Sequence, residues 1–278
     1  MAENNRYCLD LVKKSDHDRY MTILYAPPDR RDDLSALYAF NYEISRIRES
    51  ISEVMLGEIR LQWWREAIDD IFQGTTRKHD IIPALAKAIG QHDLSREIFM
   101  EILDGRTQDI YDESPKDISD LTDYLDRTTG NLSRLAVHVT GQRDMDDLAG
   151  HLGIAWGFVG MVRSVCYYNS LKKNFMPREL LTGSGHSDLC FLSPDRPDEA
   201  KAVIRELCQQ TEQHLDHISN DKNRIKPESR SVFLLSALTR SYLKTIKKAG
   251  YNPFKLSEQA DAIFRHWRLL TAALFNRI

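Results

Sequence analysis

The chain has 278 residues, enough to bury a large hydrophobic core, and its 42% hydrophobic and 28% charged residues are ordinary for a soluble protein. Its net charge of −3 offers no excess of basic residues, so we expect no nucleic-acid partner. Nine prolines and thirteen glycines are few for this length and favour long, uninterrupted helices.

The N-terminal stretch MAENNRYCLDLVKKSD has acidic residues and no apolar run, so it predicts neither a secretory signal nor a transit peptide. We expect residues 1–15 to be an N-terminal extension of a cytoplasmic protein. No run of about eighteen apolar residues occurs, which predicts no transmembrane segment and leaves peripheral contact with the inner membrane open. The four cysteines are scattered and indicate reduced thiols rather than disulfides or a zinc site.

Residues 16–53 predict the first core helices. The Pro-Pro pair at 27–28 interrupts them, and Asp32 or Asp33 can begin the next helix because an acidic side chain favours the positive end of the helix dipole. We expect that helix to continue through Glu53.

Residues 57–74 predict an amphipathic helix in which Trp63 and Trp64 belong to the core. After a short loop, further helices are expected within residues 99–115 and 120–141.

Residues 152–177 predict a helix that is unusually rich in small residues. Apolar residues recur at three- and four-residue steps, and no proline interrupts them before Pro177. A glycine costs about 1 kcal/mol relative to alanine inside a helix. The glycines here therefore indicate either close packing of another helix or close approach of a flat ligand.

The run GSGHSDLCFLSPDRPDE at 183–199 predicts a loop, and three amphipathic helices follow at 198–219, 227–248 and 256–275. Histidines are scattered along these last helices, and we expect none of them to bind a metal: His214, His217 and His266. The chain has no P-loop, no GxGxxG motif and no Ser-His-Asp set.

The stretch LGIAWGFVGMVRSVCYYNSLKKNFMP resembles the second signature of the squalene/phytoene synthase family, LG-x-A-x-Q-x-x-N-I-x-R-D-x-x-x-D followed by a basic G-R-x-Y-L-P segment. The matching positions are Leu152, Gly153, Ala155, Arg163 and Pro177. The departures fall on the family's polar positions: Gly157 for glutamine, Gly160 for asparagine, Ser164 and Tyr168 for the two aspartates, and Lys172-Lys173 for Gly-Arg.

The family's first acidic motif, DDxxD, follows a helix that resembles Tyr38-Ala39-Phe40 in this chain. An ungapped register places the three aspartates on Ser45, Arg46 and Glu49; a shift of one helical turn places them on Glu49, Ser50 and Glu53. Both registers stay open, and neither restores the motif. Two further patterns resemble the family, a G-x-x-x-D pattern with Asp109 and a helix with Gly130.

The departures matter because paired carboxylates at i and i+4 lie on one helix face, where they can hold Mg²⁺ against a substrate diphosphate. The metal stabilises the diphosphate as a leaving group. Ser164 offers one weak neutral oxygen, and a tyrosine phenol at position 168 stays protonated near neutral pH. The sequence thus lacks one wall of the metal clamp.

The resemblance covers about residues 16–275. It implies an all-α, single-domain isoprenoid synthase (terpenoid-synthase) fold over residues 1–278, with helices around a central cavity. The degenerate catalytic positions are Ser45, Arg46, Glu49, Glu53, Ser164 and Tyr168. The implied ligand-binding positions are Tyr38, Phe40, Asp109, Gly130, Gly157, Gly160, Arg163, Lys172 and Lys173. We expect no metal ligand and no cofactor.

The degenerate motifs favour a pseudoenzyme of a divergent branch that includes a mitochondrial assembly factor for respiratory complex I. Such a protein would bind a prenyl lipid, assist respiratory-complex assembly with a protein partner, or both. The alternative is an active Mg-dependent prenyltransferase that joins two isoprenoid diphosphates head to head, with remaining acidic and basic residues replacing the lost metal sites. A third function is a helical scaffold whose cavity is filled and which binds only protein.

Overall fold

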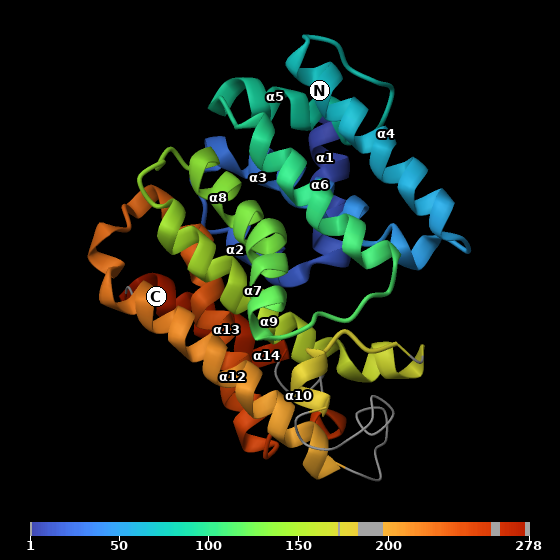
Figure 1. Ribbon diagram of the computed structural model, residues 1–278. Coiled ribbons are helices and arrows are strands. Elements are labelled where there is room, and N and C mark those ends of the chain that lie inside the picture. The colour runs from blue at the N-terminus through green and yellow to red at the C-terminus, as the bar shows by residue number, and fades with distance from the viewer. Residues whose placement is uncertain (1, 172, 183–196, 257–261, 276–278) are drawn as a thin grey trace.

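The computed structural model describes residues 2–171, 173–182, 197–256 and 262–275. These residues form helices and no strand, which confirms the predicted all-α class (Figure 1). The α-helices are α1 (Ala2–Ser15), α2 (His17–Ile23), α3 (Arg31–Ser45), α4 (Val54–Phe72), α5 (Ile82–His92), α6 (Arg96–Ile110), α7 (Ile118–Leu125), α8 (Asn131–Val139), α9 (Asp146–Ser170), α10 (Arg178–Thr182), α12 (Pro197–Asn220), α13 (Arg230–Lys248) and α14 (Ala262–Phe275).

Polar residues of the sequence determine where several helices begin. Asp16 accepts a hydrogen bond from the backbone N–H of Arg19 at 3.1 Å and caps α2. Asp117 caps α7 in the same way, accepting from the N–H of Asp120 at 2.8 Å. These side chains satisfy backbone donors that have no partner within the helix.

Helix α9 is a central helix of the half of the fold formed by α7, α8, α12 and α13. It contacts α8, α12 and α13, and it passes close to η3 (Asp126–Gly130), a single π-helical turn between α7 and α8. A Cβ atom on Gly153 would lie 2.1 Å from the carbonyl oxygen of Thr129, and one on Gly157 would lie 2.5 Å from Leu125 Cδ2. These two glycines therefore serve the close packing of helices, the first of the two interpretations offered by the sequence.

Helix α9 is also long and apolar enough to cross a membrane by length and composition alone. However, 72% of its most apolar stretch is buried inside the fold. A helix that is hydrophobic all round and covered by its neighbours is a core helix.

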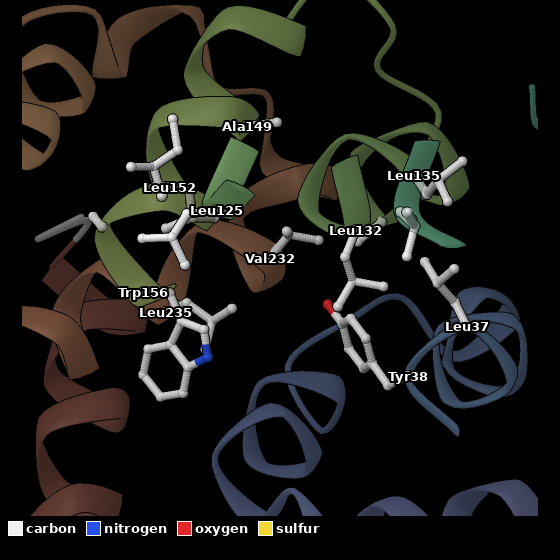
Figure 2. Packing of buried hydrophobic residues seen from close by; sticks show 14 of the residues in the cluster. Leu37, Tyr38, Leu125, Leu132, Leu135, Ala149, Leu152, Trp156, Val232 and Leu235 are labelled. Atoms are coloured by element: carbon white, nitrogen blue, oxygen red, sulfur yellow. The ribbon is translucent and has the colours of Figure 1, made fainter. Parts of the chain in front are cut away.

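Buried side chains from distant parts of the chain form one hydrophobic cluster. Figure 2 shows Leu132 and Leu135 of α8 facing Tyr38 and Leu37 of α3, while Trp156 of α9 lies beside Leu235 of α13. Of the two tryptophans expected in the core, Trp64 is buried and in edge-to-face contact with Phe40, with ring centroids 5.3 Å apart, and Trp63 is partly buried against the core.

The N-terminal extension expected at residues 1–15 contains helix α1, whose Cys8 and Val12 are fully buried. The structure corrects two boundaries. The helix expected to reach Glu53 ends at Ser45, and a turn and the short 3₁₀ helix η2 (Arg48–Ser50) follow it. The segment 120–141 is divided by the π-helical turn. Residues 183–196 of the expected loop lie outside the described residues, and the remaining positions belong to α12 (Pro197–Asn220).

Candidate functional site

A cavity of about 430 Å³ lies where α3, α6 and α9 end, with α7 forming a further wall. Such a volume is within the range of about 300–1,000 Å³ typical of small-molecule sites. One part of the wall is apolar and the other is charged or hydroxylated. The apolar residues are Ile51, Pro115, Leu121, Met161, Leu171 and Phe175; the polar ones are Ser45, Arg48, Glu49, Arg106, Gln108, Asp109, Glu113, Tyr124, Tyr167, Tyr168 and Lys173.

Asp109 anchors a buried polar network on one wall. Its carboxylate accepts hydrogen bonds from the Tyr124 hydroxyl at 2.7 Å and from Arg106 Nη1 at 3.1 Å. Burial opposes the charge of Arg106, but the neighbouring Tyr124 and Asp109 raise the pKa of the guanidinium above its usual value. Arg106 is therefore a permanent cation that is already paired.

Asp112 holds two cations at a second wall. It accepts from Arg48 Nε at 2.9 Å, with a second hydrogen bond from Arg48 Nη2, and from Lys173 Nζ at 2.8 Å. Partial burial raises the pKa of Asp112, but the hydrogen bonds from Arg48 and Lys173 outweigh it and hold the pKa below its usual value. This ion pair joins η2 to the segment after α9.

The first degenerate motif is split by the end of α3. Ser45 and Glu49 line the cavity, whereas Arg46 lies outside it in a shallow groove against the ring of Tyr42. Glu53 is exposed at the start of α4. Because no α-helix spans residues 46–53, Glu49 in η2 and Glu53 before α4 do not share a helix face, and the second register loses its physical basis.

The second degenerate motif reaches the same cavity through Tyr168. Burial, together with the charges of Asp109 and Glu49, raises the pKa of Tyr168 to about 12, so its hydroxyl remains a hydrogen-bond donor. Ser164 donates to the carbonyl of Met161 at 3.0 Å. Lys173 lines the cavity, and Lys172 lies outside the described residues.

Other predicted ligand-binding residues lie elsewhere. Tyr38 and Phe40 are buried in the hydrophobic core, and Gly130 and Gly157 are covered by neighbouring side chains. Gly160 differs, because a Cβ there would meet no atom within 4 Å. Arg163 lies over the ring of Tyr242, and its Nη1 is 3.3 Å from the buried Asp18.

The donor set of the cavity does not fit a magnesium cluster. Mg²⁺ prefers several oxygen ligands in octahedral geometry, mostly carboxylates, waters and phosphates. Here Asp109 is bound to Arg106 and Tyr124, and burial together with the nearby charge of Glu49 raises the pKa of Tyr167. Among the described residues, no three His, Cys, Asp or Glu side chains come together in a way that could hold a metal ion.

Sequence reasoning missed Arg48, Arg106, Asp112, Tyr124 and Tyr167. Arg106 and Tyr124 lie 18 positions apart, and Arg48 and Asp112 lie 64 apart, so no local spacing connects them. The signal available was that Arg106 and Asp109 are separated by one helical turn beside a predicted site residue.

A histidine cluster, also missed, lies between α9 and α12. His151 Nδ1 is 2.7 Å from His214 Nδ1, and the rings of His151 and His217 stack at 4.3 Å. Burial, reinforced by the two neighbouring histidines, lowers the pKa of His214 to about 4. The rings of His214 and His217 both contact that of His151, and among the described residues no three such side chains are placed to hold a metal ion.

The comparisons with known proteins agree with this architecture. The family model described as squalene/phytoene synthase matches residues 12–271. One relative is NADH dehydrogenase (ubiquinone) complex I, assembly factor 6 of Rattus norvegicus, which is 30% identical over 93% of this chain and 78% of its own length. The relative of that name in Homo sapiens is 29% identical over 92% of this chain and 77% of its own length. A presqualene diphosphate synthase of Sinorhizobium fredii is 28% identical over 60% of each chain.

Solved structures show the same fold. A dehydrosqualene synthase crystallised with a ligand superposes with a TM-score of 0.88 at 18% identity, covering 99% of this chain and 97% of that one. A squalene synthase from Alicyclobacillus acidocaldarius superposes with a TM-score of 0.80 at 18% identity, covering 90% of this chain and 95% of that one. The helical fold is therefore that of the isoprenoid synthases, as the resemblance implied. With the match over nearly its whole length, the chain belongs to the squalene/phytoene synthase family.

Proposed function

We propose that this protein assists the assembly of respiratory complex I and binds a prenyl lipid in its cavity without condensing it. One observation carries the second part: the cavity has apolar lining residues, but the motif positions that line it, Ser45, Glu49 and Tyr168, supply two hydroxyls and a single carboxylate instead of the family's metal-binding aspartates. The relatives named as complex I assembly factor 6 support the first part.

The physical reason for the absence of condensation is the leaving group. Ionising an allylic diphosphate requires several kcal/mol of charge stabilisation, which bound metal ions supply in metal-dependent enzymes. Arg48, Arg106 and Lys173 are the cations of the described cavity wall, and each is already bound to a carboxylate. We accordingly propose that the protein works without a metal or other cofactor.

Release of diphosphate tests the catalytic part directly. The purified protein is incubated with farnesyl or geranylgeranyl diphosphate and Mg²⁺, beside an active dehydrosqualene synthase as the positive control. We expect no release above that of buffer. Release that disappears in Glu49→Gln, but persists in the exposed-site control Glu228→Gln, would establish the active prenyltransferase instead.

Assembly is tested in the cell that makes the protein. Deleting the gene should reduce the amount of fully assembled complex I on native gels while leaving the other respiratory complexes unchanged, and the wild-type gene should restore it. Normal complex I in the deletion strain would refute this part of the proposal.

We also propose that the protein is cytoplasmic and touches the inner membrane peripherally. The burial of α9, which has the composition of a membrane span, supports attachment from the surface rather than by insertion. Cell fractionation with a salt or carbonate wash tests this. Release of the protein by the wash is expected, and retention in the washed membrane would contradict the proposal.

A further inference from the structure

We infer that the cavity selects an uncharged isoprenoid-type amphiphile, with an alcohol or carbonyl oxygen as its head group, over the corresponding diphosphate. This inference rests on the proposed lipid binding. It follows from the charges fixed around the cavity and from the hydrogen-bond donors that remain there.

The described cavity wall carries no excess of positive charge. Its cations are Arg48, Arg106 and Lys173, and its carboxylates are Glu49, Asp109 and Glu113. Asp112, immediately behind Arg48 and Lys173, adds a fourth carboxylate. Even a full additional charge from Lys172, which lies outside the described residues, would only bring this group to neutrality. A diphosphate with more than one negative charge would meet no net cation.

Helix orientation adds to this effect. Ser45 is the last residue of α3, Asp109 lies in the last turn of α6, and Tyr168 lies in the last turn of α9. The C-terminal end of a helix carries partial negative charge, whereas anions bind at N-terminal ends. Three helices thus present to the cavity the end that suits a metal cation, while the part of the chain that the structure describes brings together no donor set that would hold one.

The cations are also unavailable without breaking existing pairs. An anion would have to displace Asp112 from two partners, or Asp109 from Arg106 and Tyr124. Displacing a carboxylate with an anion exchanges one charge-assisted contact for another and leaves the displaced charge to be solvated.

A neutral oxygen meets none of these obstacles. The Tyr168 hydroxyl stays protonated because burial raises its pKa, and it lines the cavity beside Asp109. A neutral acceptor can accept a hydrogen bond from this hydroxyl without adding charge, while Leu121, Met161 and Phe175 offer apolar contact to a hydrocarbon tail.

The test compares farnesol with farnesyl diphosphate, with and without Mg²⁺, by calorimetric or tryptophan-fluorescence titration of the whole protein. We expect farnesol to bind at least about tenfold more tightly, and Mg²⁺ to leave both affinities unchanged. Tighter binding of farnesyl diphosphate would overturn the inference while leaving prenyl-lipid binding intact. Failure of both ligands to bind would refute the lipid-binding function itself, and the inference with it.

Charge variants locate the cause of the selection. Glu49→Gln and Glu113→Gln each remove one negative charge with little change in shape, and each should strengthen farnesyl diphosphate binding about fivefold and change farnesol binding by much less. Glu228→Gln, an exposed residue outside the cavity wall, is the matched control and should change neither affinity. Equal effects of all three variants would overturn the electrostatic explanation. Tyr168→Phe should weaken farnesol about fivefold, and an unchanged farnesol affinity would remove this hydroxyl from the site.

Discussion

Substituting alanine at two glycines of the same helix should change stability in opposite directions. At Gly153 an added Cβ would lie 2.1 Å and 2.4 Å from the carbonyl oxygen and carbon of Thr129 and 2.5 Å from Gly130 Cα. All three atoms are backbone, so the contact cannot be relieved by rotating a side chain. At Gly160 an added Cβ would meet nothing within 4 Å.

The magnitude follows from two opposing effects. Alanine improves helix propensity by about 1 kcal/mol at either position. Overpacking costs typically about 1–3 kcal/mol, and the backbone clash at position 153 belongs at the upper end. Gly153→Ala should therefore lower the free energy of unfolding by about 2 kcal/mol, whereas Gly160→Ala should raise it by about 0.5–1 kcal/mol.

Urea and thermal unfolding, followed by circular dichroism, measure both variants beside the wild-type protein. The expected fall in Tm for Gly153→Ala is about 4–8 °C, since a change of 1 kcal/mol shifts a protein of this size by about 2–4 °C. A Gly153→Ala protein as stable as Gly160→Ala would refute the argument that α9 needs glycine to approach η3.

Three more outcomes follow from the buried polar groups. The folded pKa of His214, about 4, lies below its ordinary value of 6.5, so the unfolded chain binds the proton first. The free energy of unfolding should therefore be highest above pH 6.5 and fall by about 2 kcal/mol toward pH 4. Urea titrations at several pH values should show that His214→Gln removes most of this pH dependence. Asp112→Asn removes the charge that binds Arg48 and Lys173 and should destabilise the fold by about 1–2 kcal/mol at pH 7. Because these cations hold the pKa of Asp112 below its usual value, the difference from wild type should shrink once the pH falls below the pKa of a free carboxyl and vanish below the pKa of the folded state. Tyr124→Phe leaves Asp109 without its 2.7 Å hydroxyl donor and should cost about 1 kcal/mol in the same assay; an unchanged midpoint would contradict this role.

Much of the fold follows from local patterns. Helical periodicity placed α12 at 198–219 and α13 at 227–248, close to the observed Pro197–Asn220 and Arg230–Lys248. The end of α3 was missed because Arg46, Ile47 and Arg48 are compatible with a helix, whereas in the structure Arg48 lies in η2 and binds Asp112, 64 residues away.

The site was predictable only in part. Glu49, Asp109, Tyr168 and Lys173 were named from the resemblance, and the structure brings all of them to one cavity. The partner of Lys173 could not be foreseen, because Asp112 is 61 residues away and reaches it only after α6 and α9 have packed.

The amino-acid sequence alone determined the helical class, the family and the loss of the aspartates, since each depends on residue type and spacing along one helix. Tertiary structure alone decided that Gly153 and Gly157 serve packing, that Glu49 and Glu53 separate, and that Arg48 and Lys173 share one carboxylate. The physical reason is that charge pairing and close approach depend on distances between helices, and those distances are set by how the whole core packs.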